Sequence, residues 1–493
     1  MNKLLIVHGY SDQSATFEGL AHFLRHQGIY RDIRYINYDS LDDQATFQDY
    51  ADRLNDIYTS EYGNERIDIL CHSTGSLVVR AWLALRRQRQ LRRGTSLDMP
   101  VERLYLFAPA NFGSDLATLG QSFWNRARRF LSMGNDSDQD GDSPWEVGKR
   151  ILQGLEPASP EQWFLSQLDL HGGPQAGYFG VEPNPCFAFV FAAGRVEKFL
   201  GDRIISASVK PGTDATVRIC GTSLNTRKYV FRPVNSDLDT APLTLDVGNK
   251  AQRIPFTVFY DLNHTSIIGG RLNPGQLVGE DEYLHIDQSW SPLPLFKAAQ
   301  TVTTLEQYAA VAQQFAAVDE QNYQNWQRDQ AFAQDFSDAE DLQKYRDRYQ
   351  QIFFRFGDDV DDEVSEVFID FYVYDSGDQP HRTLTHELDE IIFQASEFYA
   401  HSVRKSHRVV LFNYDRWLQF RDQLDALNAK VILEIYAEPT SRSAYYERCR
   451  RVIYDPSWPA AHQEGQMFFY PNTTTLVEVV LNRRQREGLL KHQ

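Results

Sequence analysis

One serine in this sequence stands where covalent chemistry is expected. In the segment Ile69–Leu77 (ILCHSTGSL), an apolar run ends two residues before Ser73, and a pattern of helical period follows it. A strand, a tight turn and a helix in this order lift the serine hydroxyl clear of a sheet edge, where it can attack a carbonyl group. The start of a helix also favours negative charge developing beside it. The simpler alternative is an ordinary serine N-cap.

The residues around Ser73 fit a turn between closely packed elements. Small residues two before and two after the serine let the strand and the helix approach; Gly75 fills the second place, and Cys71 stands where a glycine is usual. A Ser-x-Gly triplet alone is weak, because average composition gives roughly two chance occurrences in a chain of this length. The context is stronger, since His8-Gly9-Tyr10 ends an earlier apolar run. Parallel strands finish at the same sheet edge, where ligands bind.

The pairing of Ile6–Tyr10 (IVHGY) with Cys71–Gly75 (CHSTG) resembles the α/β-hydrolases of the lipase and esterase group, and within it lipases with a His-Gly oxyanion turn. The resemblance implies that the nucleophile, the acid and the histidine follow one another in this order along the chain. It also implies an oxyanion hole made by the backbone N–H groups of Tyr10 and Thr74, each worth about 3–4 kcal/mol in comparable sites.

Two later segments are similar to those that carry the acid and the histidine in such lipases. Gly212–Val217 (GTDATV) resembles an Asn-Asp-Gly-x-Val turn and makes Asp214 the candidate acid, with Ala215 where glycine is usual. Leu262–Thr265 (LNHT) resembles an Asn-His segment and makes His264 the candidate base. The competing candidates are Asp202, Asp239 and Asp261 for the acid and His285 for the base, and an ordinary turn aspartate or structural histidine is the alternative to both.

The implied mechanism is acyl transfer. Ser73 attacks the acyl carbonyl, His264 takes its proton and later delivers it to the leaving group, and Asp214 orients the imidazole. No cofactor is required, so none is expected. We predict a serine esterase or lipase that cleaves carboxylic esters, in particular lipid-like acyl esters of neutral lipids or phospholipids. The alternatives are a thioesterase or amidase of the same fold, and a non-catalytic interaction protein on a hydrolase scaffold.

The elements that must position these residues alternate through the first third of the chain. Apolar runs predict strands at 4–7, 32–38, 67–70 and 104–108, and amphipathic patterns predict helices at 14–27, at 47–58 and after Ser73. This alternation indicates an α/β fold with a parallel sheet covered on both faces, as in the α/β-hydrolases. The sheet is expected to resume at 187–192 and to extend through pieces at 217–220 and 256–260.

A helical insertion interrupts the sheet at about 113–180, where lipases of this group carry a lid. It contains the aromatic residues Trp124, Phe130, Trp145, Trp163 and Phe164. Such residues can line an acyl-binding groove or make transient contact with a lipid surface. The alternative is a packed helical cap with an aromatic core.

An acidic stretch within the insertion resembles half of a calcium site. Asp136, Asp138 and Asp140 follow the spacing D-x-D-x-D-G, with Gly141 at the sharp turn. The twelfth position, where a bidentate glutamate is usual, is Val147. Ca²⁺ is therefore a candidate ligand, and a solvated acidic loop rich in turn-forming residues is the alternative.

The chain divides into three expected regions. Residues 1–300 form the hydrolase domain, 301–348 a helical connector, and 349–493 a C-terminal domain of alternating strands that fits a β-rich, sandwich-like fold. Some lipases use such a domain for lipid docking or for forming a homodimer, and closure over the active site is a third candidate role.

Composition limits the partners. The chain has 493 residues, with 67 Asp and Glu against 50 Lys and Arg, and a formal charge of −17. This balance argues against nucleic-acid binding and against electrostatic capture by anionic membranes, which leaves apolar contact as the route to lipid. Four scattered cysteines favour a reducing compartment. No signal peptide or transmembrane segment is recognisable, so a cytoplasmic location is expected, and export by a route without a signal peptide is the alternative.

Overall fold

The computed structural model describes most of the chain in two compact units. Its described residues are 3–9, 17–36, 45–63, 65–95, 98–115, 117, 149–172, 177–196, 210–246, 248, 253–269, 290–334, 336, 338–393, 399–438, 444–459 and 467–485. The first unit comprises Met1–Glu156, Glu161–Asn225 and Gly248–Arg346, and the second comprises Pro157–Pro160, Thr226–Val247 and Asp347–Gln493.

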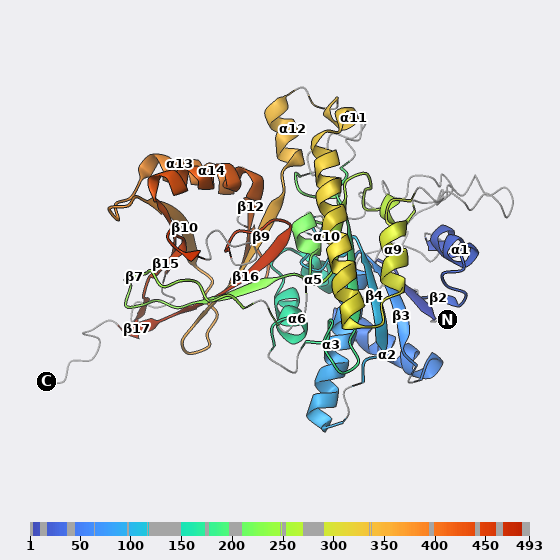
Figure 1. The fold of residues 1–493 in the computed structure, drawn as a ribbon. Helices are drawn as coiled ribbons and strands as arrows, with labels where there is room; N and C mark the ends of the chain where they lie inside the picture. Colours follow the sequence, from blue (N-terminus) through green and yellow to red (C-terminus); the bar gives the residue numbers. More distant parts are fainter. Residues whose placement is uncertain are drawn as a thin grey trace, which may run out of the picture. The chain divides into compact units, whose positions relative to one another are not determined.

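A parallel sheet forms the centre of the first unit (Figure 1). Its order is β2-β1-β3-β4-β5-β8, and every pair of neighbours is parallel. The strands are β1 (Leu4–Val7), β2 (Ile33–Ile36), β3 (Ile67–His72), β4 (Val101–Phe107), β5 (Phe187–Ala193) and β8 (Phe256–Phe259). All residues of β1, β3, β5 and β8 are buried, as expected for strands covered on both faces. The α/β fold predicted from the sequence is therefore confirmed.

The first unit also contains a set of helices. They are α1 (Glu18–His26), α2 (Phe47–Glu61), α3 (Gly75–Arg93), α5 (Lys149–Leu155), α6 (Pro160–Asp169), α8 (Ile219–Thr222), η3 (Ser266–Ile268), α9 (Leu293–Gln300), α10 (Leu305–Gln327), α11 (Gln330–Ala333) and α12 (Ala339–Arg346). A capping box of Thr46 and Asp49 starts α2, and Gly94 in the left-handed region ends α3. One core cluster joins α1, α9 and α10 to the sheet through buried aromatic residues such as Phe189 and Phe191.

The strand expected at 217–220 is wrong. These residues leave a turn and enter the short helix α8. A four-residue apolar run is too short for its period to distinguish a strand from a buried helical turn.

The long helix α10 packs on the sheet, since the Tyr308 hydroxyl donates to the Ala188 carbonyl over 2.8 Å and Thr257 Oγ1 donates to the Phe315 carbonyl over 2.8 Å. The expected boundaries at 300 and 348 stay predictions.

The second unit is rich in strands, as predicted. One sheet has the order β10-β13-β15-β7, another β11-β12-β9-β16-β6, and β14 pairs with β17. The strands are β6 (Arg227–Phe231), β7 (Leu238–Asp239), β9 (Tyr349–Asp358), β10 (Val367–Tyr374), β11 (Tyr399–Ala400), β12 (His407–Asn413), β13 (Lys430–Ala437), β14 (Ala444–Tyr446), β15 (Cys449–Tyr454), β16 (Thr473–Leu481) and β17 (Arg483–Gln485). Two helices that the sequence analysis missed, α13 (Arg382–Phe393) and α14 (Tyr414–Leu427), join the core of these sheets.

Within the described residues, no helix has the combined length and apolar character needed to cross a membrane.

A buried histidine is expected to make the second unit sensitive to acid. His407 lies at the start of β12, its Nδ1 is 3.1 Å from Ser406 Oγ, and burial lowers its pKa from the ordinary value to about 4. Between pH 6.5 and pH 4 the unfolded chain therefore binds a proton at this site that the folded chain does not bind. Stability should be unaffected by His407 above pH 6.5 and fall as the pH drops through this window, by up to about 3 kcal/mol.

The measurement is chemical denaturation at pH 7.5 and pH 4.5, followed by tryptophan fluorescence, for the unmodified chain and His407→Gln. Trp417, in the core of the second unit, is one of the tryptophans that report on unfolding. We expect the variant to lose less stability on acidification. His386→Gln is the control, because His386 lies exposed on α13. Equal pH dependence of the unmodified chain and His407→Gln would contradict the prediction.

Candidate active site

Ser73 occupies a strained turn between β3 and α3. Its φ is +53°, in the left-handed region that non-glycine residues rarely adopt. Two backbone hydrogen bonds fix the turn: Ser73 N–H donates to the Phe107 carbonyl over 3.1 Å, and Ala110 N–H donates to the Ser73 carbonyl over 3.1 Å. Such a conformation costs about 1–3 kcal/mol and is concentrated at functional sites. The tight turn expected at Ser73 is present.

Gly75 allows α3 to start against the end of β1. A Cβ added at Gly75 would lie 2.4 Å from the Val7 carbonyl oxygen and 2.8 Å from the His8 carbonyl oxygen. Any side chain at this position would therefore push the two backbones apart. Cys71, in the place of the usual first glycine, is fully buried, and burial raises the pKa of its thiol far above the ordinary value. Cys71 is thus a packing residue, since a protonated buried thiol is a poor nucleophile.

The two residues predicted to form the oxyanion hole are Thr74 and Tyr10. Thr74 is buried and directly precedes α3, among the N–H groups at the positive end of the helix dipole. Tyr10 lies outside the described residues. The nearby His8 is buried, with Nδ1 2.7 Å from the Gly9 carbonyl oxygen.

Asp214 and His264, which are 50 residues apart, lie in direct contact. His264 Nδ1 and Asp214 Oδ2 are 2.7 Å apart, and both side chains are buried. The other carboxylate oxygen accepts from the backbone N–H groups of Thr216 at 2.9 Å and Val217 at 2.8 Å. Three donors hold the carboxylate in one orientation. With Nδ1 bonded to the carboxylate, Nε2 is the nitrogen that can act as a base.

His72 places this pair beside the serine turn. His72 Nε2 lies 2.9 Å from the His264 carbonyl oxygen, and the two rings are 4.7 Å apart between centroids at an angle of 45°. His72 directly precedes Ser73, so the structure gathers Ser73, Asp214 and His264 in one place. Their catalytic roles stay predictions. The strand order is consistent with the meeting, because β3, β4, β5 and β8 are successive parallel neighbours, and Ser73, Asp214 and His264 come after β3, β5 and β8 at the same edge of the sheet.

The competing candidates that are described have other surroundings. Asp239 forms an ion pair with Arg451 in the second unit, and Asp261 is exposed. Asp202 and His285 lie outside the described residues, as do Asp136, Asp138 and Asp140 of the acidic loop. In the part of the chain that is described, no group of His, Cys, Asp or Glu side chains has the arrangement of a metal site.

Contacts that the sequence did not reveal hold the acid turn in place. Ser114 Oγ donates to the Thr216 carbonyl over 2.5 Å, and Arg218 Nε donates to Asp115 Oδ2 over 2.8 Å. Both partners come from the segment after β4, about 100 residues earlier in the chain. Side-chain contacts at this separation have no local pattern that could have predicted them.

Ala215 explains why glycine is usual beside the acid. Its φ is +75°, so the methyl group is held in a conformation that glycine adopts without strain. Ala215→Gly should therefore stabilise the chain by about 1 kcal/mol, measured by chemical denaturation. Ala310→Gly, on the exposed face of α10, is the matched control and should destabilise by about 1 kcal/mol. Destabilisation by both changes would show that Ala215 is not strained.

A parallel sheet with a strained serine turn at its switch point has the architecture of the α/β-hydrolase fold. The chain is similar over its whole length to phospholipase PlaB from Legionella pneumophila, with a TM-score of 0.74, 20% identity, and coverage of 100% of this chain and 96% of that one. A structure of PlaB in complex with thio-NAD gives a TM-score of 0.71, 19% identity and the same coverage. Bacillus licheniformis lipase BlEst2 in mature form gives only 0.35, at 16% identity over 61% of this chain and 92% of that one. No family model and no curated protein matches the sequence.

Proposed function

We propose that this chain is a serine hydrolase that cleaves carboxylic esters of lipid-like acyl groups, of the lipase or phospholipase type. The contact that carries the proposal is the 2.7 Å hydrogen bond between buried His264 and Asp214, formed beside the strained turn of Ser73. A structural histidine does not require a buried carboxylate on Nδ1 and a left-handed serine next to it. The buried carboxylate at His264 Nδ1 and the strained serine turn together match the requirements of a serine nucleophile that is activated by a base.

The proposed mechanism is acyl transfer through Ser73. Ser73 Oγ attacks the acyl carbonyl carbon as His264 Nε2 takes its proton, and the resulting imidazolium is stabilised by Asp214. The N–H groups of Thr74 and Tyr10 hold the oxyanion. The proton on His264 then passes to the departing alcohol, and the acyl group stays on Ser73. Water then attacks this acyl group, with His264 again taking the proton, and the carboxylic acid product is released. No cofactor takes part in these steps.

A lipid-like substrate is supported by two further observations. The chain shares its fold over the full length with a protein whose name is phospholipase PlaB. On α6, within the insertion, Phe164 is 55% exposed and so is available for brief contact with a lipid surface.

The test is covalent labelling with a fluorophosphonate, which reacts with activated serine hydroxyls. We expect stoichiometric labelling of the intact chain and none of Ser73→Ala. Ser60→Ala is the control, because Ser60 lies exposed on α2 and donates only to its own helix, at the Ile57 carbonyl. Labelling that survives Ser73→Ala would exclude Ser73 as the nucleophile. Absence of any labelling or ester turnover would favour a non-catalytic protein.

A further inference from the structure

His72 contacts the candidate base, although the proposed mechanism gives it no role. It is the last residue of β3, directly precedes Ser73 and is 2% exposed. Its Nε2 lies 2.9 Å from the His264 carbonyl oxygen. A carbonyl oxygen can only accept a hydrogen bond, so Nε2 carries a proton and His72 is the donor. The residue next to the candidate nucleophile therefore holds the backbone of the candidate base.

The ring of His72 is fixed by its neighbours. The Phe17 ring meets it edge to face, with centroids 5.9 Å apart at an angle of 67°, and the His264 ring lies tilted against it, with centroids 4.7 Å apart at 45°. Phe17 is fully buried. A buried ring that is packed in this way keeps one rotamer. Its N–H therefore has one direction, toward the His264 carbonyl.

The turn that carries His264 depends on this donor. Asn263 Oδ1 accepts from the N–H groups of Thr265 and Ser266 at 3.0 and 2.8 Å, which shapes the turn from within. These bonds do not reach the His264 carbonyl. In the part of the chain that the structure describes, that carbonyl accepts from His72 alone. Without the donor, a buried acceptor would lose its partner, and the backbone at His264 would be free to shift.

His264 is thus held at two points. Asp214 binds its Nδ1 over 2.7 Å and sets the orientation of the ring, and His72 binds its backbone and sets where the ring stands. Because one peptide bond joins His72 to Ser73, the nucleophile and the base share a single support. A misplacement of about 1 Å between reacting groups can cost about 100-fold in rate.

We infer that His72 is a positioning residue, whose Nε2–H holds the His264 backbone so that the imidazole Nε2 stays within reach of Ser73 Oγ. The inference rests on the proposed function. His72 itself transfers no proton in the reaction and touches no substrate. The reaction requires a hydrogen-bond donor at this position, whichever side chain supplies it.

Two exchanges separate the donor from the ring. His72→Phe keeps a planar ring without the donor and should lower kcat for p-nitrophenyl acetate by about 10- to 100-fold, with KM within about twofold. His72→Gln supplies an amide N–H at a similar reach and should restore kcat to within about threefold of the unmodified chain. The active enzyme is counted as the serine that labels with fluorophosphonate at completion, so loss of folded protein does not enter kcat. If His72→Phe does not fold, His72→Asn replaces it, because the shorter amide does not reach the carbonyl.

A spectroscopic signature reports on the base directly. The proton between His264 Nδ1 and Asp214 should give a far-downfield NMR resonance that vanishes in His264→Gln. We expect this resonance to shift or broaden in His72→Phe and to return in His72→Gln. A loss of packing elsewhere in the first unit should leave it unchanged.

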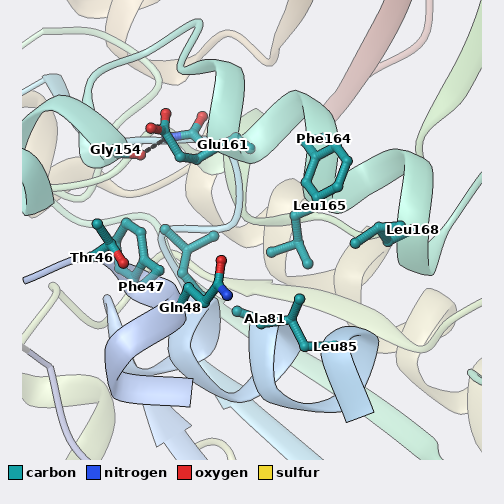
Figure 2. Close-up of a pocket in the computed structure, with 12 residues that line it drawn as sticks. Thr46, Phe47, Gln48, Ala81, Leu85, Gly154, Glu161, Phe164, Leu165 and Leu168 are labelled. Atoms are coloured by element: carbon teal, nitrogen blue, oxygen red, sulfur yellow. Dashed lines mark hydrogen bonds between the residues drawn. The ribbon is translucent and has the colours of Figure 1, made fainter. Parts of the chain in front are cut away.

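Leu85→Ala is the control for such a general loss of packing. Leu85 belongs to α3 and lines a pocket formed by α3, α6 and the start of α2 (Figure 2). None of the described residues that line this pocket belongs to the candidate active site. The variant should lower the melting temperature and leave kcat per labelled serine, KM and the resonance unchanged.

Fluorophosphonate labelling separates failure of this inference from failure of the proposed function. If all variants label and His72→Phe keeps its kcat, the inference is wrong and the proposed function stands. The inference is also wrong if His72→Gln loses as much activity as His72→Phe, since the donor is then not what the site requires. If the unmodified chain neither labels nor turns over esters, the proposed function fails and the inference falls with it.

Discussion

Asp214→Asn is expected to lower kcat for p-nitrophenyl esters by about 10,000-fold, with little change in KM. The Asp214 carboxylate accepts from His264 Nδ1 and so keeps Nε2 free of its proton, ready to act as a base. An asparagine amide can present its NH₂ group to Nδ1 and favour the opposite tautomer. It also cannot neutralise the imidazolium that forms during the reaction.

The measurement is steady-state kinetics across pH 6–9, with circular dichroism to check that the variant is folded. Asp261→Asn is the control, since Asp261 is exposed and lies three residues before His264. It should retain near-full activity. If Asp214→Asn retains it as well, another carboxylate supplies the acid, and Asp202 would be the next to test.

Asp169→Ala is expected to destabilise the first unit by about 3–5 kcal/mol, because it leaves a buried guanidinium without its carboxylate. Asp169 and Arg80 are fully buried, and Arg80 Nε and Nη2 donate to the two carboxylate oxygens over 2.8 and 3.1 Å. Burial raises the pKa of Asp169, and Arg80 opposes that rise. The pair ties α6 of the insertion to α3.

Chemical denaturation, monitored by loss of fluorophosphonate labelling at Ser73, reports on this unit. Asp52→Ala is the matched control, because the Asp52–Arg89 pair joins α2 to α3 with both side chains about 40% exposed. Such a pair contributes about 0–1 kcal/mol. Replacing both buried partners, as in Arg80→Met with Asp169→Leu, should restore most of the lost stability. Equal effects of Asp169→Ala and Asp52→Ala would show that the buried pair is not holding the insertion.

The elements of the first unit could be predicted because their signals are local. The apolar run before Ser73 and the stripe after it come from residues adjacent in sequence, and strand, turn and helix follow from that order alone. Gly75 at the position of closest approach was recognisable for the same reason. The amphipathic period of α14, with Tyr414, Trp417 and Leu424 buried, was equally local and could have been recognised.

Other features had no such signal. The run at 217–220 was too short for its period to separate a strand from α8. The contact of α10 with the sheet depends on hydrogen bonds between side chains and strands that are 58 to 120 residues apart.

The sequence by itself determined that Ser73 stands on a strand-to-helix turn, because backbone sterics and hydrophobic periodicity act over a few residues. It also nominated Asp214 and His264, through a resemblance of short segments. Only the tertiary structure decided that these two side chains meet over 2.7 Å, that Asp239 pairs with Arg451 and that Asp261 is exposed. The physical reason is that sheet order and side-chain packing arise from contacts between segments far apart in the sequence. The free energy of these contacts cannot be deduced from any short segment alone.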